Sequence, residues 1–331
     1  MIEYLTNPQL PSINEDFRGN IFMNGQFEME AVNTRPVPFF TILQWQFNKK
    51  EVKKAKKAQP YQVPLQKEEH LLDTSGNWLA WLGHSSFLIR LGGKTIITDP
   101  CLTDLPFIKR LVGLPFSFEK LQNIDYLLIS HGHRDHYDQA CIHKLIEQNP
   151  AIQLLMPLKI SSLLGKYRSR TSFQEAGWYQ QFNTESSDLS IYFLPAKHWN
   201  RRGLLDYNRT LWGSFWIQYK DFKLYFAGDT AYYSHFTEIK KVLGAPDVCL
   251  MPVGAYRPAH IMNEAHTSPI EAVRGFHDLG GKTFIPMHYG TYDLADEPLG
   301  EPIALLTHLQ TQGQLNGSLQ MPAVGEVFPL A

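Results

Sequence analysis

The sequence predicts an α/β protein with a four-layer α+β arrangement, in which two β-sheets pack together between helices. Short apolar runs separated by glycine turns come first, between residues 78 and 98, as expected of strands joined in hairpins. After residue 124, apolar runs of strand length alternate with stretches of helix length. Because every sheet face needs a covering layer, this order of elements favours two sheets enclosed by helices.

Each expected element has its own local signal. Strands are indicated by runs of β-branched and aromatic residues that end at Gly, Pro or Asp. The expected strands are Trp78–Gly83, Ser86–Leu91, Lys94–Thr98, the run that ends at Ser130, and residues near 152–156, 190–195, 211–219, 222–227, 247–251 and 283–287. The expected helices are Gln139–Gln148, His235–Val242, Ser268–Leu279 and Glu301–Gln312.

Composition changes near residue 70. Residues 1–70 lack sustained alternation and carry six lysines between Lys49 and Lys57. We therefore expect residues 1–70 to form an N-terminal arm or cap, which packs on the core or lies at a membrane surface. Residues 71–331 are expected to form the main domain.

Overall composition excludes several classes of protein. The 331 residues are 44% hydrophobic, as in ordinary globular proteins, and carry 31 basic and 32 acidic residues for a net charge of −1. Because no global positive field results, a nucleic-acid partner is not expected. The three cysteines, Cys101, Cys141 and Cys249, form neither a C-x-x-C pair nor a disulfide framework. We expect a cytoplasmic protein, since the first residues lack an apolar leader and no run of about 18 apolar residues occurs.

Four groups able to bind a metal lie within six residues where an apolar run ends: His131, His133, Asp135 and His136. Functional sites in α/β proteins form at the carboxyl ends of strands. Imidazole and carboxylate ligands suit zinc and other first-row metals, whereas calcium and magnesium prefer oxygen ligands. The plainer interpretation is a polar loop without a metal, but such packing would add repulsion and desolvation at low pH. The cluster therefore predicts a metal site.

The spacing predicts two metal ions. If His131 and His133 point to one side of the turn, Asp135 and His136 continue around it toward a second ion. Three more candidates each follow an apolar run, namely His198, Asp229 and His288. Taken singly, each has a plainer structural explanation: the histidines as partly buried side chains, and the aspartate as a turn or N-cap residue. Together with the cluster they complete a ligand set.

The predicted allocation places His131, His133 and His198 on one ion and Asp135, His136 and His288 on the other, with Asp229 bridging the two. Two Zn²⁺ ions are expected. Iron or manganese would suit the same ligands, and cellular supply helps to decide which metal is bound. A water that bridges two cations loses a proton near neutral pH, and the paired ions stabilise attacking and leaving oxygens. The predicted chemistry is hydrolysis.

This H-x-H-x-D-H pattern, with its three later ligands, resembles the metallo-β-lactamase superfamily. The resemblance implies an αβ/βα sandwich of two mixed β-sheets flanked by helices, with the site along one edge. Further strings resemble the N-acylphosphatidylethanolamine-hydrolysing phospholipase D branch and its bacterial relatives: Trp81-Leu-Gly-His-Ser-Ser, Thr98-Asp-Pro, Lys197-His-Trp-Asn-Arg-Arg, Leu211-Trp-Gly-Ser, Phe226-Ala-Gly-Asp-Thr, Pro252-Val-Gly-Ala-Tyr-Arg-Pro and His288-Tyr-Gly-Thr-Tyr-Asp-Leu-Ala.

The resemblance also implies an activity and its residues. It implies a metal-dependent phosphodiesterase that releases an N-acylethanolamine from a phospholipid, with Asp135 and His266 as catalytic residues. His266 occupies the place of a family histidine over the metals, where it would contact the phosphate or protonate the leaving alkoxide. Without the family, His266 is a helix-start residue that caps Thr267-Ser-Pro. Asp99 would orient a ligand histidine from behind the metals, and His84 is assigned to the same surrounding layer.

The substrate stays open at this point. Ala265 stands where the lipase-like members carry a polar amide, and the segment 257–265 differs from theirs. A lactone or other ester is the main alternative, since ascorbate-phosphate lactonases have a similar histidine pattern, and RNA is the weaker one. A third hypothesis is a non-catalytic metal protein. The oligomeric state, a homo-oligomer included, is also open.

Residues 37–57 present a membrane question. An aromatic patch between Val37 and Phe47 precedes the lysines, and such a pairing is used at anionic lipid surfaces. The partners expected are thus a small-molecule or lipid substrate and a peripheral contact with the inner face of the membrane. The competing interpretation is an arm whose aromatics pack on the core while Lys49–Lys57 forms a solvated helix face.

Overall fold

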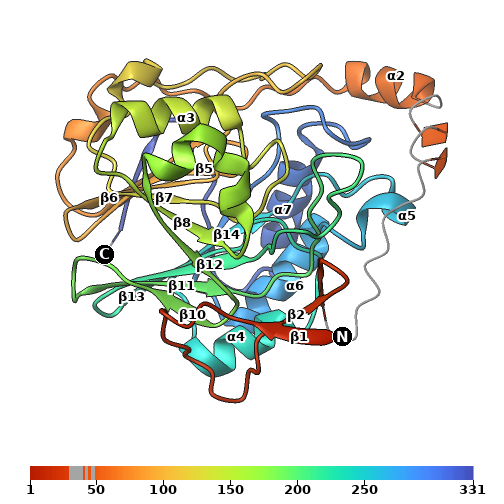
Figure 1. Cartoon of the computed structure of the whole chain (residues 1–331). Helices are drawn as coiled ribbons and strands as arrows, with labels where there is room; N and C mark the ends of the chain where they lie inside the picture. The colour runs from red at the N-terminus through yellow and green to blue at the C-terminus, as the bar shows by residue number, and fades with distance from the viewer. Residues whose placement is uncertain (30–39, 42–43, 46–48, 331) are drawn as a thin grey trace.

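The computed structural model describes residues 1–29, 40–41, 44–45 and 49–330. Within these residues, two seven-stranded mixed sheets pack together and helices cover their outer sides (Figure 1). The prediction of an αβ/βα sandwich is confirmed.

The first sheet holds the strands that lead to the histidine cluster. In spatial order it consists of β17 (Val327–Pro329), β4 (Trp78–Gly83), β5 (Ser86–Leu91), β6 (Lys94–Thr98), β7 (Tyr126–Leu128), β8 (Gln153–Pro157) and β9 (Ser172–Ala176). Strands β4, β5 and β6 form antiparallel hairpins, whereas β6 to β9 run parallel. Because β6 and β7 are parallel neighbours, their carboxyl ends place Asp99 beside Ser130, whose backbone N–H donates to Asp99 Oδ1 at 2.7 Å.

The second sheet holds the strands that lead to the later candidates. Its spatial order is β10 (Gln180–Phe182), β11 (Leu189–Leu194), β12 (Ser214–Tyr219), β13 (Phe222–Phe226), β14 (Val248–Pro252), β15 (Thr283–Met287) and β16 (Ser318–Leu319). Strands β10 to β13 are antiparallel and β13 to β16 parallel. Because β11 and β13 flank the oppositely directed β12, their carboxyl ends lie on the same edge as that of β15.

Helices cover the outer faces of both sheets. The longer helices are α3 (Gln139–Gln148) and the 3-10 segment η3 (Ile160–Ser169) on the first sheet, and α4 (His235–Leu243), α6 (Pro269–Leu279) and α7 (Glu301–Thr311) on the second. The shorter ones are η1 (Leu71–Asp73), η2 (Phe118–Lys120) and α5 (Ala259–Met262). At the start of α3, the Asp138 carboxylate accepts hydrogen bonds from the backbone N–H groups of Ala140 and Cys141.

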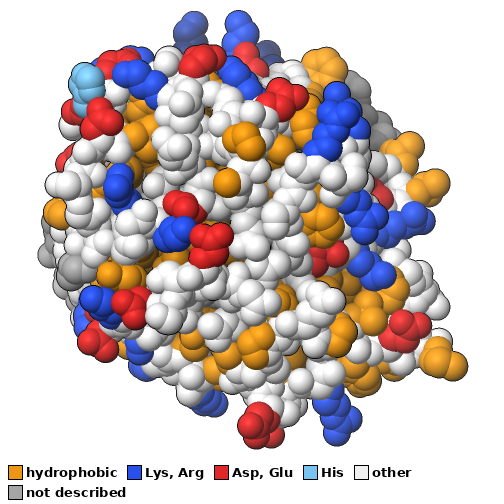
Figure 2. All heavy atoms as spheres, turned by 60° about the vertical axis from the view of Figure 1, so that its left-hand side comes forward, with side chains coloured by type: hydrophobic (Ala, Val, Ile, Leu, Met, Phe, Trp, Pro, Cys, Tyr) orange, Lys and Arg blue, Asp and Glu red, His pale blue; other side chains and the backbone are white. Residues whose placement is uncertain are grey.

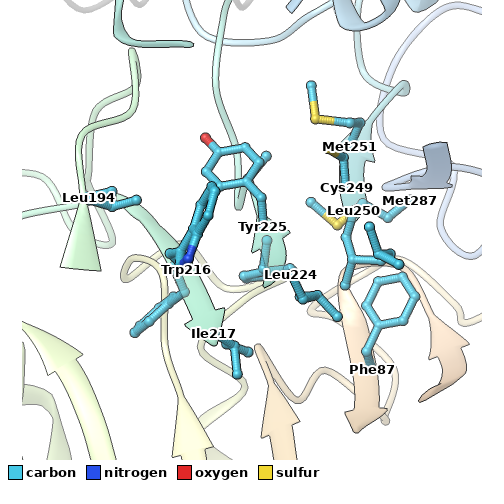
Figure 3. Close-up of a cluster of buried hydrophobic side chains, with 14 of the residues drawn as sticks. Phe87, Leu194, Trp216, Ile217, Leu224, Tyr225, Cys249, Leu250, Met251 and Met287 are labelled. Carbon is cyan, nitrogen blue, oxygen red and sulfur yellow. The ribbon is translucent and has the colours of Figure 1, made fainter. Parts of the chain in front are cut away.

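The core lies between the two sheets and continues beneath the helices. Figure 3 shows Phe87 of β5 close to Leu250 and Met287 of the second sheet, all three fully buried. Trp216 and Tyr225 lie on neighbouring strands of the same sheet and are also fully buried. Burial of such side chains contributes roughly 1.5–3 kcal/mol each, so this core holds the strand ends, and hence the site, in fixed positions.

The described residues before 30 form a small third sheet that the sequence analysis missed. It consists of β1 (Ile2–Leu5), β2 (Asn20–Met23) and β3 (Gln26–Glu28). Phe27 is fully buried in the main core, and the Asn20 side-chain oxygen accepts a hydrogen bond from the Trp178 backbone N–H at 3.0 Å. This part of the arm therefore packs on the main domain. The proposed boundary at residue 70 stays a prediction.

Only part of the predicted membrane segment can be described, because residues 37–39, 42–43 and 46–48 lie outside the described residues. Helix α2 (Lys50–Ala58) buries none of its residues. Trp45 Nε1 donates to Asp296 Oδ2 at 2.7 Å, and Lys56 pairs with Asp293. These contacts attach the segment to the loop that follows β15.

Surface charge is evenly mixed on the face shown in Figure 2, where acidic and basic side chains alternate without a large area of one sign. Such a mixture agrees with the net charge of −1. Among the described helices, none is both long and apolar enough to cross a bilayer.

Most predicted elements lie where the sequence placed them. Helix α3 has the predicted bounds, and the ends of α4, α6 and α7 differ from them by one residue. The strand expected over 211–219 begins only at Ser214, because Gly213 donates its backbone N–H to Ser130 at 3.0 Å instead of pairing along the sheet. That bond joins the second sheet to the loop that bears the cluster.

Candidate metal centre

All ten residues singled out in the sequence lie at one edge of the sandwich. They come from both sheets and from the loop after α5, and they are His84, Asp99, His131, His133, Asp135, His136, His198, Asp229, His266 and His288. Four overlapping groups with ligand-type atoms within 4.8 Å of one another contain all ten. The structure thus brings every candidate together, while their individual roles stay predictions.

The first predicted ligand set forms a compact triangle of nitrogens. His131 Nε2 lies 2.9 Å from His133 Nδ1, which lies 3.1 Å from His198 Nε2. Nitrogens bound to one tetrahedral zinc at about 2.0–2.1 Å would be roughly 3.4 Å apart, so this spacing is close to that of a metal site.

Outer hydrogen bonds leave the inner nitrogens of two of these histidines free of protons. His198 Nδ1 donates to the Ala265 carbonyl at 2.9 Å. His131 Nδ1 lies 2.9 Å from Ser130 Oγ, which itself donates to Asp99 and can therefore only accept from the imidazole. With each outer nitrogen protonated, each Nε2 presents a lone pair to the centre, as a metal ligand must.

The second predicted set surrounds Asp135. Asp135 Oδ2 lies 3.5 Å from His288 Nε2 and 3.6 Å from His136 Nε2. His84 Nε2 lies 3.0 Å from the same oxygen and orients the carboxylate. His136 Nδ1 donates to Asp99 Oδ2 at 2.7 Å, so Asp99 lies behind a candidate ligand.

Asp229 lies between the two sets. Its Oδ2 is 3.1 Å from His136 Nε2 and 3.2 Å from His288 Nε2 on one side, and 4.0 Å from His131 Nε2 on the other. The aspartate is almost fully buried, and its Oδ1 lacks a hydrogen-bond partner among the described residues. A buried carboxylate surrounded by histidines from both sets is what a bridging ligand requires.

The electrostatics of the first set favour metal binding. Burial holds the pKa of His131 and of His198 well below the ordinary value. For Asp229, burial alone would raise the pKa, but His136 and His288 outweigh it and hold that pKa well below its usual range. The neutral imidazoles of His131 and His198 therefore face an ionised Asp229 carboxylate at neutral pH. Burial lowers the pKa of His136 and of His288, but Asp229 and Asp135 outweigh it and raise both pKa values, so these two imidazoles must lose a proton when a metal binds.

The donor set fits two metal ions. Buried atoms with no hydrogen-bond partner in the described structure lie at the centre, among them Asp229 Oδ1 and His266 Nδ1. Leaving such atoms unpaired costs about 1–3 kcal/mol each, and more for charged groups. Cations at the centre would satisfy them, and the mixed N and O donors suit zinc, iron or manganese.

His266 projects into the centre from the loop after α5. Its Nδ1 lies 3.7 Å from Asp229 Oδ2, and its side chain is 14% exposed. Burial lowers its pKa to about 4, although Asp229 acts in the opposite sense. The structure does not support the helix-capping interpretation of His266. Ser268 caps α6 instead: its side chain accepts the Glu271 backbone N–H, and the Glu271 carboxylate accepts the Ser268 backbone N–H.

Sequence reasoning missed several supporting residues. Ser130 links Asp99 to His131, and Asn200 Oδ1 accepts the Gly132 backbone N–H at 3.0 Å. The Trp199 ring lies edge-on to His133, with centroids 4.6 Å apart. Trp199 and Asn200 directly follow His198 in the sequence, and this adjacency is the sequence signal that could have indicated their supporting roles.

Comparison with known proteins decides the family. A family model described as beta-lactamase superfamily domain matches residues 94–289. The chain belongs to the metallo-β-lactamase superfamily. That assignment covers β6 through β15, which are the strands that carry nearly all the candidate residues.

Curated relatives within the superfamily include two lipid hydrolases. N-acyl-phosphatidylethanolamine-hydrolyzing phospholipase D 1 of Caenorhabditis elegans is 31% identical over 234 residues, which cover 66% of this chain and 65% of that protein. The mitochondrial enzyme of the same name from Saccharomyces cerevisiae is 27% identical over 275 residues, covering 80% of this chain and 58% of that protein. The alignments thus span less than two thirds of either relative.

Solved structures agree on the metallo-β-lactamase fold. A metallo hydrolase from the archaeon Ignicoccus hospitalis superposes with a TM-score of 0.59 at 20% identity, covering 78% of this chain and all of that one. Such a likeness establishes the fold. Together with the superfamily match, it identifies the chain as a metallo-β-lactamase-fold protein that carries candidate metal-binding histidine and aspartate groups.

One glycine fixes the position of His288. A Cβ at Gly254 would lie 1.9 Å from the carbonyl oxygen of His288. Gly254→Ala should therefore destabilise the protein by roughly 3 kcal/mol, because the rigid backbone on both sides must move. Denaturant unfolding of the variant measures this. Gly113→Ala, whose Cβ would meet only Leu65 Cδ2 at 3.5 Å, is the control, and equal stability of the two variants would contradict the prediction.

Proposed function

We propose that this chain is a dinuclear metal-dependent phosphodiesterase of phospholipase D type that hydrolyses N-acylphosphatidylethanolamine-like lipids. The observation that carries the proposal is the position of Asp229, whose Oδ2 lies within 4.0 Å of candidate ligands from both sets. Similarity to the nematode phospholipase supports the substrate class.

Each set of ligands would serve one ion. His131, His133 and His198 would hold the first, Asp135, His136 and His288 the second, and Asp229 would join them. Two ions held this way supply an activated water and neutralise the charge that develops on the phosphate oxygens.

The chain's own residues keep the site in its reactive arrangement. His84 fixes the Asp135 carboxylate through a 3.0 Å contact, and Asp99 fixes the ring of His136 through a 2.7 Å hydrogen bond. Such outer contacts keep the ligands from reorganising as charge develops in the transition state.

His266 would contact the substrate and not a metal. His266 is more exposed than His131, His198 and His288, which are almost fully buried. It also lies on the loop after α5 and does not directly follow a strand. Because its pKa is lowered, the imidazole is neutral at neutral pH and can donate one N–H to a phosphate oxygen. We therefore propose phosphate binding as its role.

The test is hydrolysis of N-acylphosphatidylethanolamine in mixed micelles by metal-analysed protein. We expect release of N-acylethanolamine and phosphatidic acid, loss of that release with a chelator, and its return when Zn²⁺ is added back. Phosphatidylcholine in the same micelles is the control for headgroup selectivity. Hydrolysis of a simple lactone without any release from the lipid would contradict the lipid assignment and favour the lactonase alternative.

A further inference from the structure

Two loops beside the candidate metal centre carry exposed apolar side chains at their tips. Phe107 is 107% exposed, and Leu204 and Leu205 are 84% and 83% exposed. Apart from Met1, no large apolar side chain in the described residues is more exposed than these three. Scattered apolar surface residues are ordinary, but here the extremes come from two loops far apart in the sequence.

The loop with Phe107 is tightly held. Leu105 and Ile108 exchange backbone hydrogen bonds of 2.9 and 3.1 Å, and Phe107 between them has a φ of +66°, which is unfavourable for a bulky side chain. The Arg110 guanidinium donates to the Cys101 carbonyl at 2.8 Å. The loop therefore holds the phenyl ring away from the protein.

The loop with the two leucines is tied down in the same way. The Asp206 carboxylate accepts backbone N–H groups of Arg202 and Gly203, which closes the turn. The Arg202 guanidinium donates to the Gly132 carbonyl at 2.7 Å and to the Tyr137 carbonyl at 2.9 Å. The base of this loop is thus attached to the segment that carries the histidine cluster.

The two loops lie together at the edge of the centre. A cavity of about 360 Å³ is lined by residues 103–106 of the first loop, Arg202 of the second, and Arg134 and Asp138 between them. Arg134 lies between His133 and Asp135 in the sequence. A surface that received the three apolar tips would therefore also face the metal-binding loop.

The charges around the tips favour an anionic surface. Lys109 and Arg134 are exposed, and Arg201 is partly exposed. The nearby carboxylates are occupied by the protein's own donors: Asp104 accepts the Arg110 backbone N–H, Asp138 caps α3 and Asp206 closes its turn. Arg134 and Arg201 each give one N–H to a carbonyl of the loop with the two leucines. Because a guanidinium carries five N–H donors, both can still bind an anionic partner.

We propose that Phe107, Leu204 and Leu205 insert into an anionic lipid surface and hold the metal centre against it. The inference rests on the proposed lipid substrate, but it assigns the docking role to loops 103–109 and 201–206 and not to residues 37–57. A protein partner would need complementary pockets and a continuous interface of about 800 Å² per side. Separate projecting tips do not offer that, whereas a lipid interface accepts side chains of any shape.

The test compares the triple variant Phe107→Ser, Leu204→Ser, Leu205→Ser with the wild type. We expect its binding to phosphatidylcholine vesicles that contain phosphatidylglycerol to fall at least roughly tenfold, since three apolar side chains are lost. Hydrolysis of N-acylphosphatidylethanolamine in those vesicles should fall in parallel, while hydrolysis of soluble bis-p-nitrophenyl phosphate stays unchanged. Ile2→Ser with Tyr4→Ser removes two other exposed apolar side chains and is the matched control.

The outcomes separate this inference from the proposed function. Unchanged vesicle binding by the triple variant would overturn the docking role whatever the protein hydrolyses. A fall in molecular mass measured by light scattering, from dimer to monomer, would overturn it by assigning the tips to a second copy of the chain. Weakened vesicle binding together with an absence of lipid hydrolysis in the wild type would support the docking surface and contradict the proposed substrate.

Discussion

Replacing Asp229 by Asn should lower turnover of bis-p-nitrophenyl phosphate about a thousandfold or more and reduce bound metal from two ions per chain to one or none. The amide keeps the shape of the side chain but removes the negative charge that lies within 4.0 Å of both ligand sets. Two-metal catalysis supplies several kcal/mol of transition-state stabilisation, and about 1.4 kcal/mol corresponds to tenfold in rate.

The measurement combines metal analysis with steady-state kinetics on protein that is shown to be folded by circular dichroism. Asp278→Asn is the matched control, because that carboxylate also accepts a hydrogen bond, from Tyr232, but lies away from the centre. Two tightly bound ions and near-normal turnover in the Asp229 variant would refute the bridging role.

Replacing His266 by Phe should lower turnover about a hundredfold while leaving two ions bound, since removal of one preorganised donor to a developing charge typically costs 10²–10³-fold. The loss should be similar for the lipid and for bis-p-nitrophenyl phosphate, because the phosphate oxygen that accepts the N–H is common to both. His266→Gln keeps an N–H donor and should recover part of the rate.

Metal content and leaving-group dependence distinguish the alternatives for His266. A loss confined to the lipid, whose alkoxide is a much poorer leaving group than p-nitrophenolate, would instead assign His266 as the proton donor. Loss of one ion in the Phe variant would instead show that His266 is a metal ligand. Its Nδ1 lies 3.7 Å from Asp229 Oδ2, close enough for the two groups to share an ion.

The sequence predicted most strands and helices after residue 77 well because each signal there is local. The apolar run before His131 is a strand of the first sheet, and the runs before Asp229 and His288 are strands of the second sheet whose carboxyl ends meet at one edge. Asp138 and Ser268 mark helix starts with ordinary caps. The convergence of all the candidates also requires the two sheets to pack with these edges together.

The rest depends on contacts between distant segments. The strands before residue 30 are short and owe their place to partners such as Trp178 and Gln180, which lie more than 150 residues away. Ser130 and Asn200 could be assigned supporting roles only once the loop around Gly132 was seen. The exposed tips at Phe107 and Leu204 have no sequence signature, because an apolar residue in a loop is more often buried than presented.

The position of the centre between the two sheets has a consequence for assembly. Each predicted ligand set draws on both halves of the chain: His198 joins two residues of the first half, and His288 joins two others. Neither half could therefore hold a complete set before the sheets dock. Bound metal would link the two halves of the chain across the sandwich. Metal binding would therefore require, and could be used to measure, correct docking of the two sheets.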